Sequence, residues 1–281
     1  MNERKLSGSM LAEYDCWLRR AERACATREK YLRSIRVFAA WLGGAAVTTD
    51  AVTEWKAHLV QQRQAPSTIN TALAALNGLF RFLGWEDCRA NFLKVQRRIF
   101  RDSERELTRA EYDRLLGAAE KSSDARLALL MESICATGIR VSEVKYLTVE
   151  AAQCGRAEVA LKGKIRTILL PAKLCRKLLK YARKQKIARG EIFLSTGGKS
   201  MDRRQIWAAM KRLCCKAGVA SSKVFPHNLR HLFATAYYRM YRDIVKLADM
   251  LGHSSIETTR IYLVESGAEH QRQLERLGLV T

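Results

Sequence analysis

The sequence predicts a mainly α-helical protein with one small β-hairpin, divided into a helical amino-terminal domain and an α+β carboxy-terminal domain. Apolar residues recur at helical spacing through most of the 281 residues. Two short apolar runs flank residues 162–164, which is typical of two strands joined by a tight turn. A basic stretch of weak periodicity separates the two parts. We therefore expect domains at 1–88 and 107–281, joined by a basic linker at 89–106.

Four apolar stripes predict four helices in the first domain. They run through residues 11–21, 31–42, 52–59 and 69–83. Gly43 and Gly84 stand where the second and fourth stripes stop, and glycine is the usual residue just past a helix end. Pro66 follows the third stripe, and the residue before a proline disfavours helix. No residue set in this part has the composition of a catalytic site.

The second domain begins with a helix that a capping box starts. Thr108 and Glu111 have the spacing in which each side chain bonds the backbone N–H of the other residue. Further stripes predict helices that run through residues 124–137, 174–181, 206–213 and 244–251. A second capping box, Ser254 with Glu257, predicts a short helix that carries Tyr262.

The charge balance narrows the class of partner. Fifty Lys and Arg residues against 28 Asp and Glu residues give a net charge of +22. So many positive charges repel one another unless a polyanion neutralises them. Nucleic acid is therefore the favoured partner, and an acidic membrane surface is the second. We expect a cytoplasmic protein, because neither a signal peptide nor a bilayer-spanning stretch is visible. Eight scattered cysteines without a C-x-x-C pair predict reduced thiols rather than zinc or disulfides.

One constellation has the residue types that phosphodiester cleavage requires. Arg140 and Arg230 are candidates to hold the two non-bridging oxygens of one phosphate, because a guanidinium stays charged and donates paired hydrogen bonds. Tyr262 is a candidate nucleophile, and a phenol with an ordinary pKa of about 10 needs a base or cationic neighbours at neutral pH. The histidines available for that task are His227, His231 and His253. Each residue alone has a commoner structural explanation, so the set carries the prediction.

The order and spacing of these residues resemble the tyrosine site-specific recombinases, in particular the Xer-like and phage-integrase branch. The motifs that carry the resemblance are Ala-Thr-Gly-Ile-Arg-Val-Ser-Glu at 136–143, Lys-Gly at 162–163, Pro-His-Asn-Leu-Arg-His at 226–231, Leu-Gly-His-Ser-Ser at 251–255 and Ile-Tyr at 261–262. The match is strong over 107–281 and looser in the amino-terminal part, which is similar to a SAM-like core-binding domain. The resemblance implies a C-shaped clamp of two domains around double-stranded DNA. It also implies recombination for integration, excision or inversion of a DNA element, without metal, cofactor or ATP.

The resemblance assigns roles at the phosphate. Arg140 and Arg230 hold the scissile phosphate, and His253 binds a non-bridging oxygen. Tyr262 attacks to give a 3′-phosphotyrosyl link and a free 5′-hydroxyl, while His227 assists proton transfer at this nucleophile.

Further roles follow for the hairpin and for the residues behind the arginines. Lys162 is expected to be the general acid for the 5′-oxygen. The hairpin reaches Pro171 one residue later than the family's common pattern, so Lys164 is an alternative acid. Glu143 and His231 are expected to orient the arginines.

The expected assembly is a homotetramer on DNA, joined through the carboxy-terminal tail. The tail is polar up to an apolar set that fits one side of a short helix: Leu274, Leu277, Leu279 and Val280. Packing of this helix on its own domain is the alternative. The resemblance suggests a nucleoid-associated protein of prokaryotic or phage type, and the need for an accessory directionality factor stays open. Two other functions are weighed: a DNA-relaxing enzyme like type IB topoisomerases, and a catalytically silent DNA-binding protein.

Overall fold

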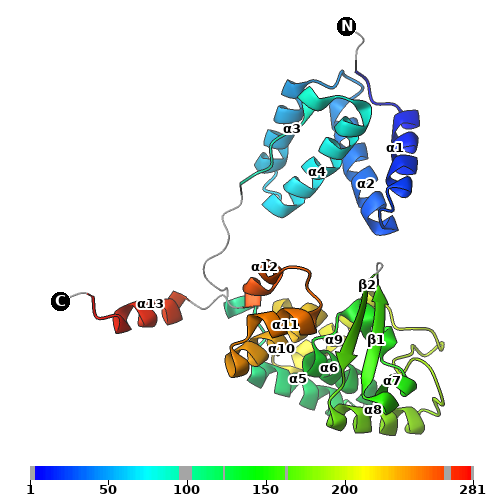
Figure 1. The fold of residues 1–281 in the computed structure, drawn as a ribbon, viewed down its shortest axis with the longest axis vertical. Helices are drawn as coiled ribbons and strands as arrows, with labels where there is room; N and C mark the ends of the chain where they lie inside the picture. The colour runs from blue at the N-terminus through cyan, green and yellow to red at the C-terminus, as the bar shows by residue number, and fades with distance from the viewer. Residues whose placement is uncertain (1–3, 95–102, 123, 162–163, 263–266, 280–281) are drawn as a thin grey trace. The chain divides into compact units, whose positions relative to one another are not determined.

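The computed structural model describes residues 4–94, 103–122, 124–161, 164–262 and 267–279. The chain divides into two compact units, Met1–Arg97 and Arg98–Thr281, and the boundary falls within the expected linker. Helices dominate both units, and the described strands form one antiparallel pair (Figure 1). The predicted fold class, mainly helical with a small hairpin, is confirmed.

The first unit packs four helices around an aromatic and aliphatic core. The helices are α1 (Gly8–Arg20), α2 (Cys25–Leu42), α3 (Thr49–Gln61) and α4 (Pro66–Leu83), followed by the short 3-10 turn η1 (Glu86–Cys88). Phe38 and Trp55 meet edge to face at 5.1 Å between ring centroids, and both are buried. Gly43 and Gly84 end α2 and α4 in the left-handed conformation, as predicted.

Two asparagines of α4 hold the segment that leaves this unit. Asn77 bonds both the N–H and the carbonyl of Ala90, and Asn70 bonds both groups of Leu93. Each amide side chain thereby satisfies one backbone N–H and one backbone carbonyl, as a neighbouring strand would. The first residues of the predicted linker therefore belong to this unit: they run along α4 without regular secondary structure of their own.

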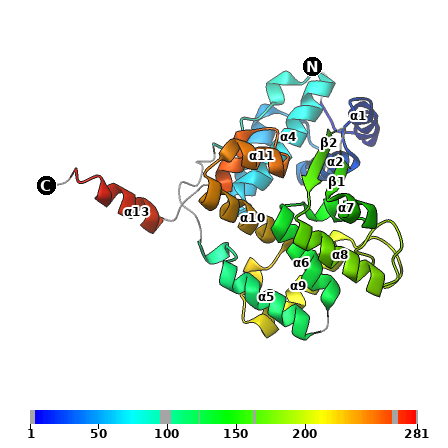
Figure 2. The ribbon, with the colours of Figure 1, turned by 60° about the horizontal axis from the view of Figure 1, so that its bottom comes forward.

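The second unit is built around α6, which is buried on several sides. Its elements in order are η2 (Ser103–Arg105), α5 (Arg109–Lys121), α6 (Ala125–Thr137), η3 (Val141–Tyr146), α7 (Val149–Cys154), β1 (Arg156–Leu161), β2 (Lys164–Leu169), α8 (Ala172–Lys184), α9 (Arg203–Ala217), η4 (Ser221–Lys223), α10 (Pro226–Tyr241), α11 (Ile244–Leu251), α12 (Ile256–Thr259), η5 (Arg260–Tyr262) and α13 (Gly267–Arg276). Helices α5, α8, α9 and α10 all pack on α6. Figure 2 shows α5, α6 and α8 from another side. The capping box of Thr108 and Glu111 starts α5 as predicted.

The hairpin presents one face to the core and one to solvent. Strands β1 and β2 pair with Val159 opposite Arg166 and Ala157 opposite Ile168. Ile168 is 3% exposed, whereas Ile165 on the other face is 79% exposed. Side chains alternate along a strand, so Arg166 shares the inward face with Ile168.

Two details of the tyrosine segment differ from the sequence prediction. The cap of α12 is Ser255, whose hydroxyl accepts from the N–H of Glu257, and not Ser254. Tyr262 lies in the 3-10 turn η5 that follows α12, rather than in the helix itself. Within the described residues, no helix is long and apolar enough to cross a membrane.

Candidate active site

The first component of the site is the turn between α6 and η3. Gly138 ends α6 at φ 64, in the left-handed region that favours glycine. Its backbone passes so close to α10 that an added Cβ would lie 2.5 Å from Cδ1 of Phe233. The turn directs Arg140 outward and Glu143 inward, and Glu143 is only 3% exposed. The Glu143 carboxylate accepts from the Arg140 N–H at 2.9 Å and from Arg140 Nη1 at 3.0 Å.

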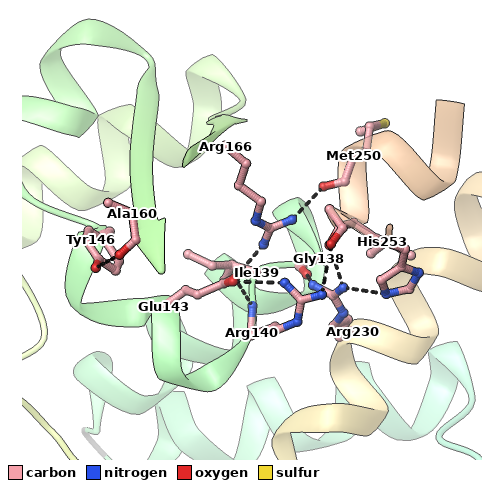
Figure 3. A network of polar contacts seen from close by, with 12 residues as sticks. Gly138, Ile139, Arg140, Glu143, Tyr146, Ala160, Arg166, Arg230, Met250 and His253 are labelled. Carbon is pink, nitrogen blue, oxygen red and sulfur yellow. Dashed lines mark hydrogen bonds and ion pairs between the residues drawn. The ribbon is translucent and has the colours of Figure 1, made fainter. Parts of the chain in front are cut away.

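Three arginines converge on the carboxyl end of α11. Successive backbone carbonyls each accept from a different guanidinium (Figure 3). Arg166 Nη1 bonds the carbonyl of Met250 at 3.0 Å, Arg230 Nη2 bonds that of Leu251 at 2.8 Å, and Arg140 Nη2 bonds that of Gly252 at 3.2 Å. The last carbonyls of a helix lack partners within it and carry the negative end of its dipole. The end of α11 therefore helps to offset the repulsion among three cations.

Glu143 adds a carboxylate with a formal negative charge to this cluster of arginines. Arg166 Nη2 bonds its Oε2 at 2.5 Å, so one carboxylate joins Arg140 from the turn to Arg166 from β2. Burial raises the pKa of Glu143, but the N–H of Arg140 and the charge of Arg166 outweigh this effect, and the net pKa is lowered. Glu143 is therefore ionised at neutral pH.

Gly252 is needed where α11 meets the arginines. It takes φ 62 at the end of the helix, and an added Cβ would lie 2.5 Å from Cδ of Arg166. Both its backbone conformation and the space beside it exclude a side chain. The glycine of the Leu-Gly-His motif thus gives Arg166 its place.

Arg230 and His253 form the deepest part of the site. Arg230 is 2% exposed, and it also donates to the carbonyl of Gly138. Burial and the charge of Arg140 lower the pKa of Arg230 to about 10, so it remains a cation at neutral pH. Desolvation and the charges of Arg230 and Arg140 lower the pKa of His253 to about 4, so its imidazole is neutral.

The partners of His253 define which ring nitrogen carries the proton. Nε2 lies 2.9 Å from Nη2 of Arg230, which can only donate, so Nε2 is the acceptor. Nδ1 lies 2.9 Å from Oγ1 of Thr259 and therefore carries the hydrogen. Thr259 is fully buried at the end of α12. The same bond ties the imidazole to the segment that leads into Tyr262.

Tyr262 is enclosed by the candidate catalytic groups. Its side chain is 3% exposed. The ring of His231 meets it edge-on at 4.8 Å between centroids, and that of His253 is stacked at 6.0 Å. Tyr262 also lies close enough to Arg230 to raise the pKa of that guanidinium, against the larger effect of burial. The structure thus brings together the candidate nucleophile, an arginine and two histidines.

The remaining sequence candidates lie at the rim or outside the described residues. His227 occupies the first turn of α10 with an exposed ring, and partial desolvation with the charges of Arg230 and Arg203 lowers its pKa. Lys162 lies outside the described residues. Lys164 begins β2, but its side chain is also outside what the structure describes.

The predicted orienting residues, Glu143 and His231, occupy different places. Glu143 contacts two arginines directly, as described above. His231 lies against Tyr262, and its Nε2 is 3.9 Å from Oε1 of Glu106. Its described contacts therefore connect the tyrosine to the segment before α5.

Sequence reasoning missed Arg166 and Thr259. Arg166 had a usable signal, because an arginine two residues before Ile168 falls on the inward face of a half-buried strand, where it needs a buried partner. Thr259 had none, since a threonine three residues before a tyrosine is common on any helix.

Chemically, the site is a cationic cradle beside a buried phenol. Guanidinium groups bind phosphate oxygens by charge and by paired N–H donors. Neutral imidazoles with lowered pKa values are proton acceptors at pH 7. Among the described residues, no three His, Cys, Asp or Glu side chains are grouped as a metal site would require.

Known proteins match both units. Residues 105–268 match the model of the phage integrase family, and residues 11–87 match the phage integrase N-terminal SAM-like domain. The tyrosine recombinase XerC of Roseiflexus castenholzii is 31% identical over 93% of this chain and 84% of its own length. The tyrosine recombinase XerA of Thermococcus kodakarensis is 28% identical over 95% of this chain and 94% of its own.

Solved structures share the fold. A lambda integrase tetramer bound to a Holliday junction aligns with a TM-score of 0.75 at 21% identity, over 93% of this chain and 78% of that one. The XerH recombinase bound to its difH substrate aligns with a TM-score of 0.69 at 20% identity, over 95% and 84%. The family-model match and the 31% identity to XerC establish the family: the chain belongs to the phage integrase family of tyrosine recombinases, enzymes of site-specific recombination that cleave and rejoin DNA.

Proposed function

We propose that this recombinase cleaves one DNA strand by direct attack of Tyr262 on a phosphate held by Arg140 and Arg230. The oxygen of Tyr262 forms a bond to phosphorus, and the bond from phosphorus to the 5′-oxygen breaks. The products are a 3′-phosphotyrosyl link and a free 5′-hydroxyl. Attack of a 5′-hydroxyl from a partner strand reverses the step, so no ATP is consumed.

The phosphate is proposed to lie between the exposed and the buried arginine. The Arg140 side chain is 39% exposed and can meet DNA, while Arg230 is held beneath it next to Tyr262. Each donor aimed at developing charge contributes about 3–4 kcal/mol to the transition state in comparable sites. His253 serves as a further ligand to a non-bridging oxygen when the phosphate replaces its bond to Arg230.

Two proton transfers accompany the step. The proton of Tyr262 passes to His227, whose lowered pKa keeps its imidazole neutral and able to accept. Lys162 gives a proton to the departing 5′-oxygen, with Lys164 as the alternative donor. Glu143 holds Arg140 in place, and His231 positions the ring of Tyr262.

A single observation carries this proposal: a phenol that is 3% exposed lies among Arg230, His231 and His253. The test is Tyr262→Phe on a nicked suicide substrate made from DNA that flanks the encoding locus. Wild-type protein should be trapped as a slowly migrating, protease-sensitive band, and the variant should bind DNA without forming it. Tyr241→Phe removes a hydroxyl from an exposed tyrosine and is the matched control. An equal covalent band from Tyr262→Phe would place the nucleophile elsewhere.

The proposed assembly is a tetramer on DNA in which each tail enters a neighbour. Leu274, Leu277 and Leu279 are 67%, 60% and 84% exposed, so these apolar side chains of the tail are not covered by the described part of their own chain. A groove of about 790 Å³, lined by α10, residues 106–109 and Cys135 of α6, offers an apolar seat. Its lining includes Leu107, Cys135, Leu232, Phe233 and Met240.

The groove also explains why a neighbour would matter for cleavage. His231 lines it and contacts Tyr262, so a seated tail would act on the nucleophile through this ring. Head-to-tail contacts of this kind close a ring of subunits. Deleting residues after Ala268 should leave single-site binding nearly intact and abolish synapsis. Normal strand exchange by the truncated protein would exclude the tail as the link.

The wider setting follows from this chemistry. We propose integration, excision or inversion of a DNA element as the biological reaction, carried out by a cytoplasmic, nucleoid-associated protein. An accessory protein that sets direction is a further proposed partner. Footprinting on the DNA that flanks the encoding locus would identify the target and show which reaction the sites permit.

A further inference from the structure

We infer that the exposed face of α8 is a second contact surface for duplex DNA, separate from the surface that holds the scissile phosphate. Between Ala172 and Gly190 the chain carries no carboxylate and eight exposed cations. Six lie on α8, namely Lys173, Arg176, Lys177, Lys180, Arg183 and Lys184, and Lys186 and Arg189 follow directly after it. These eight residues are called the basic face, and they have no part in the proposed reaction at Tyr262.

The positions of these cations lower the stability of the helix when no partner is bound. Arg176, Lys180 and Arg183 follow one another at helical spacing, and like charges three or four residues apart destabilise a helix. Lys173 stands in the first turn, where the helix dipole disfavours a cation. Lys186 takes φ 57, the left-handed conformation that favours glycine. A polyanion would relieve the repulsion.

Neighbouring carboxylates leave most of this charge unneutralised. Lys177 pairs with Glu132 of α6 at 2.5 Å. The other seven cations form no ion pair within the described part of the chain, although Arg189 lies near enough to Glu150 to lower the pKa of that carboxyl. A solvated helix face ordinarily intersperses both signs of charge, and this one does not.

The basic face is also remote from the tyrosine within the same unit. Helix α8 packs on α6 and α7, whereas η5 packs on α10 and α12. Figure 1 shows α8 at the lower edge of this unit and α12 at its upper edge. One duplex lying on Arg140 and Tyr262 therefore leaves the basic face available to another segment of DNA.

Duplex DNA is the occupant that the charge pattern fits. A 13-residue helix is about 20 Å long at 1.5 Å per residue, and duplex DNA places one phosphate charge about every 1.7 Å of its axis. Long, flexible lysine and arginine side chains along that length can reach phosphates irrespective of sequence. The surface goes beyond the proposed cleavage chemistry: it would gather a second duplex, or the far flank of the first.

The first test measures how two triple variants of the full chain bind a duplex of arbitrary sequence. A duplex of about 60 base pairs offers many overlapping binding positions. One variant carries Arg176→Gln, Lys180→Gln and Arg183→Gln. The control carries Lys121→Gln, Lys199→Gln and Lys216→Gln, which remove the same charge from exposed positions elsewhere in the unit. Each lost phosphate contact reduces the salt slope of log K by about 0.9, so the α8 variant should lose about 2–3 and the control less than about 1. Equal slopes for both variants would overturn the inference.

The second test maps the surface directly by lysine acetylation of the wild-type protein and mass spectrometry. The duplex should protect Lys173, Lys180 and Lys184, while Lys121 and Lys199 stay reactive. Unprotected α8 lysines would refute the assignment. Polyglutamate of equal charge that protects them as well as DNA would point to an acidic protein and overturn DNA as the occupant.

The two proposals fail in different ways. The α8 variant should still form the Tyr262 adduct on the suicide substrate at the wild-type level. Loss of the adduct in wild-type protein would contradict the cleavage mechanism and leave the acetylation result unaffected. A normal adduct with unprotected α8 lysines would contradict only the second surface.

Discussion

Replacing Arg166 with glutamine should destabilise the second unit more than the loss of any exposed ion pair would. Arg166 is 16% exposed and donates to Glu143 and to the carbonyl of Met250. Breaking a buried ion pair by removing one partner costs about 3–5 kcal/mol. Glu143 retains the N–H and guanidinium of Arg140, so we take a lower value of about 2–3 kcal/mol. For a unit of this size, that lowers Tm by roughly 5–10 °C.

A double-mutant cycle isolates the contact. Arg166→Gln with Glu143→Gln removes the buried carboxylate together with its buried cation, and only the 39% exposed side chain of Arg140 loses an ion-pair partner. The double variant should therefore recover about 1–3 kcal/mol relative to the sum of the single variants. Urea unfolding of all four proteins gives these values, and the adduct assay reports whether Arg140 has moved. Arg109→Gln breaks an exposed pair with Asp113 and should cost no more than about 1 kcal/mol. Strict additivity, or an Arg166 effect as small as that of Arg109, would refute the reasoning.

Three further predictions concern the same site. Gly252→Ala should lower the free energy of unfolding by about 1–3 kcal/mol, since φ 62 and the contact with Arg166 both oppose a Cβ; an unchanged urea midpoint would contradict this. His253 should stay neutral by NMR until near pH 4 in the free protein. Its folded-state pKa lies below the ordinary 6.5, so stability should be lost as pH falls from 6.5 toward 4, by up to about 1.4 kcal/mol per unit. Lys162→Ala should slow cleavage by about 10²–10⁴, and a 5′-bridging sulfur should rescue it; rescue of Lys164→Ala alone would reverse the assignment.

The helices of the first unit were predictable because each buries one clear stripe. Tyr14, Leu18, Ile35 and Phe38 recur at helical spacing and are all buried. Helix ends were also readable where local chemistry decides them, as at the glycines and at the capping box of Thr108. The prediction missed by one residue at Ser254, because adjacent serines offer the same hydroxyl and only the backbone conformation selects Ser255.

The site was predictable as a list of residues and not as a geometry. Arg140, Arg230, His253 and Tyr262 come from motifs far apart in the sequence, and the structure brings them together. The contacts that hold them are largely backbone carbonyls, which every residue has and no sequence pattern distinguishes. Arg166 had a signal in the strand alternation, but its partners, the carboxylate of Glu143 and the carbonyl of Met250, come from other elements and could not be identified from the sequence.

The proposed phosphate site would change the protonation state of His253 when a phosphate fills it. Nε2 of His253 accepts a hydrogen bond from Arg230, so it has no proton to offer a phosphate oxygen. A phosphate that enters between the two residues brings negative charge, which favours the imidazolium and raises the pKa of His253. With such a phosphate bound, the imidazole would take up a proton and become a donor through Nε2, and Nδ1 would keep its bond to Thr259. Because Thr259 leads directly into the turn that holds Tyr262, a phosphate bound as proposed would act on Tyr262 through His253 and Thr259.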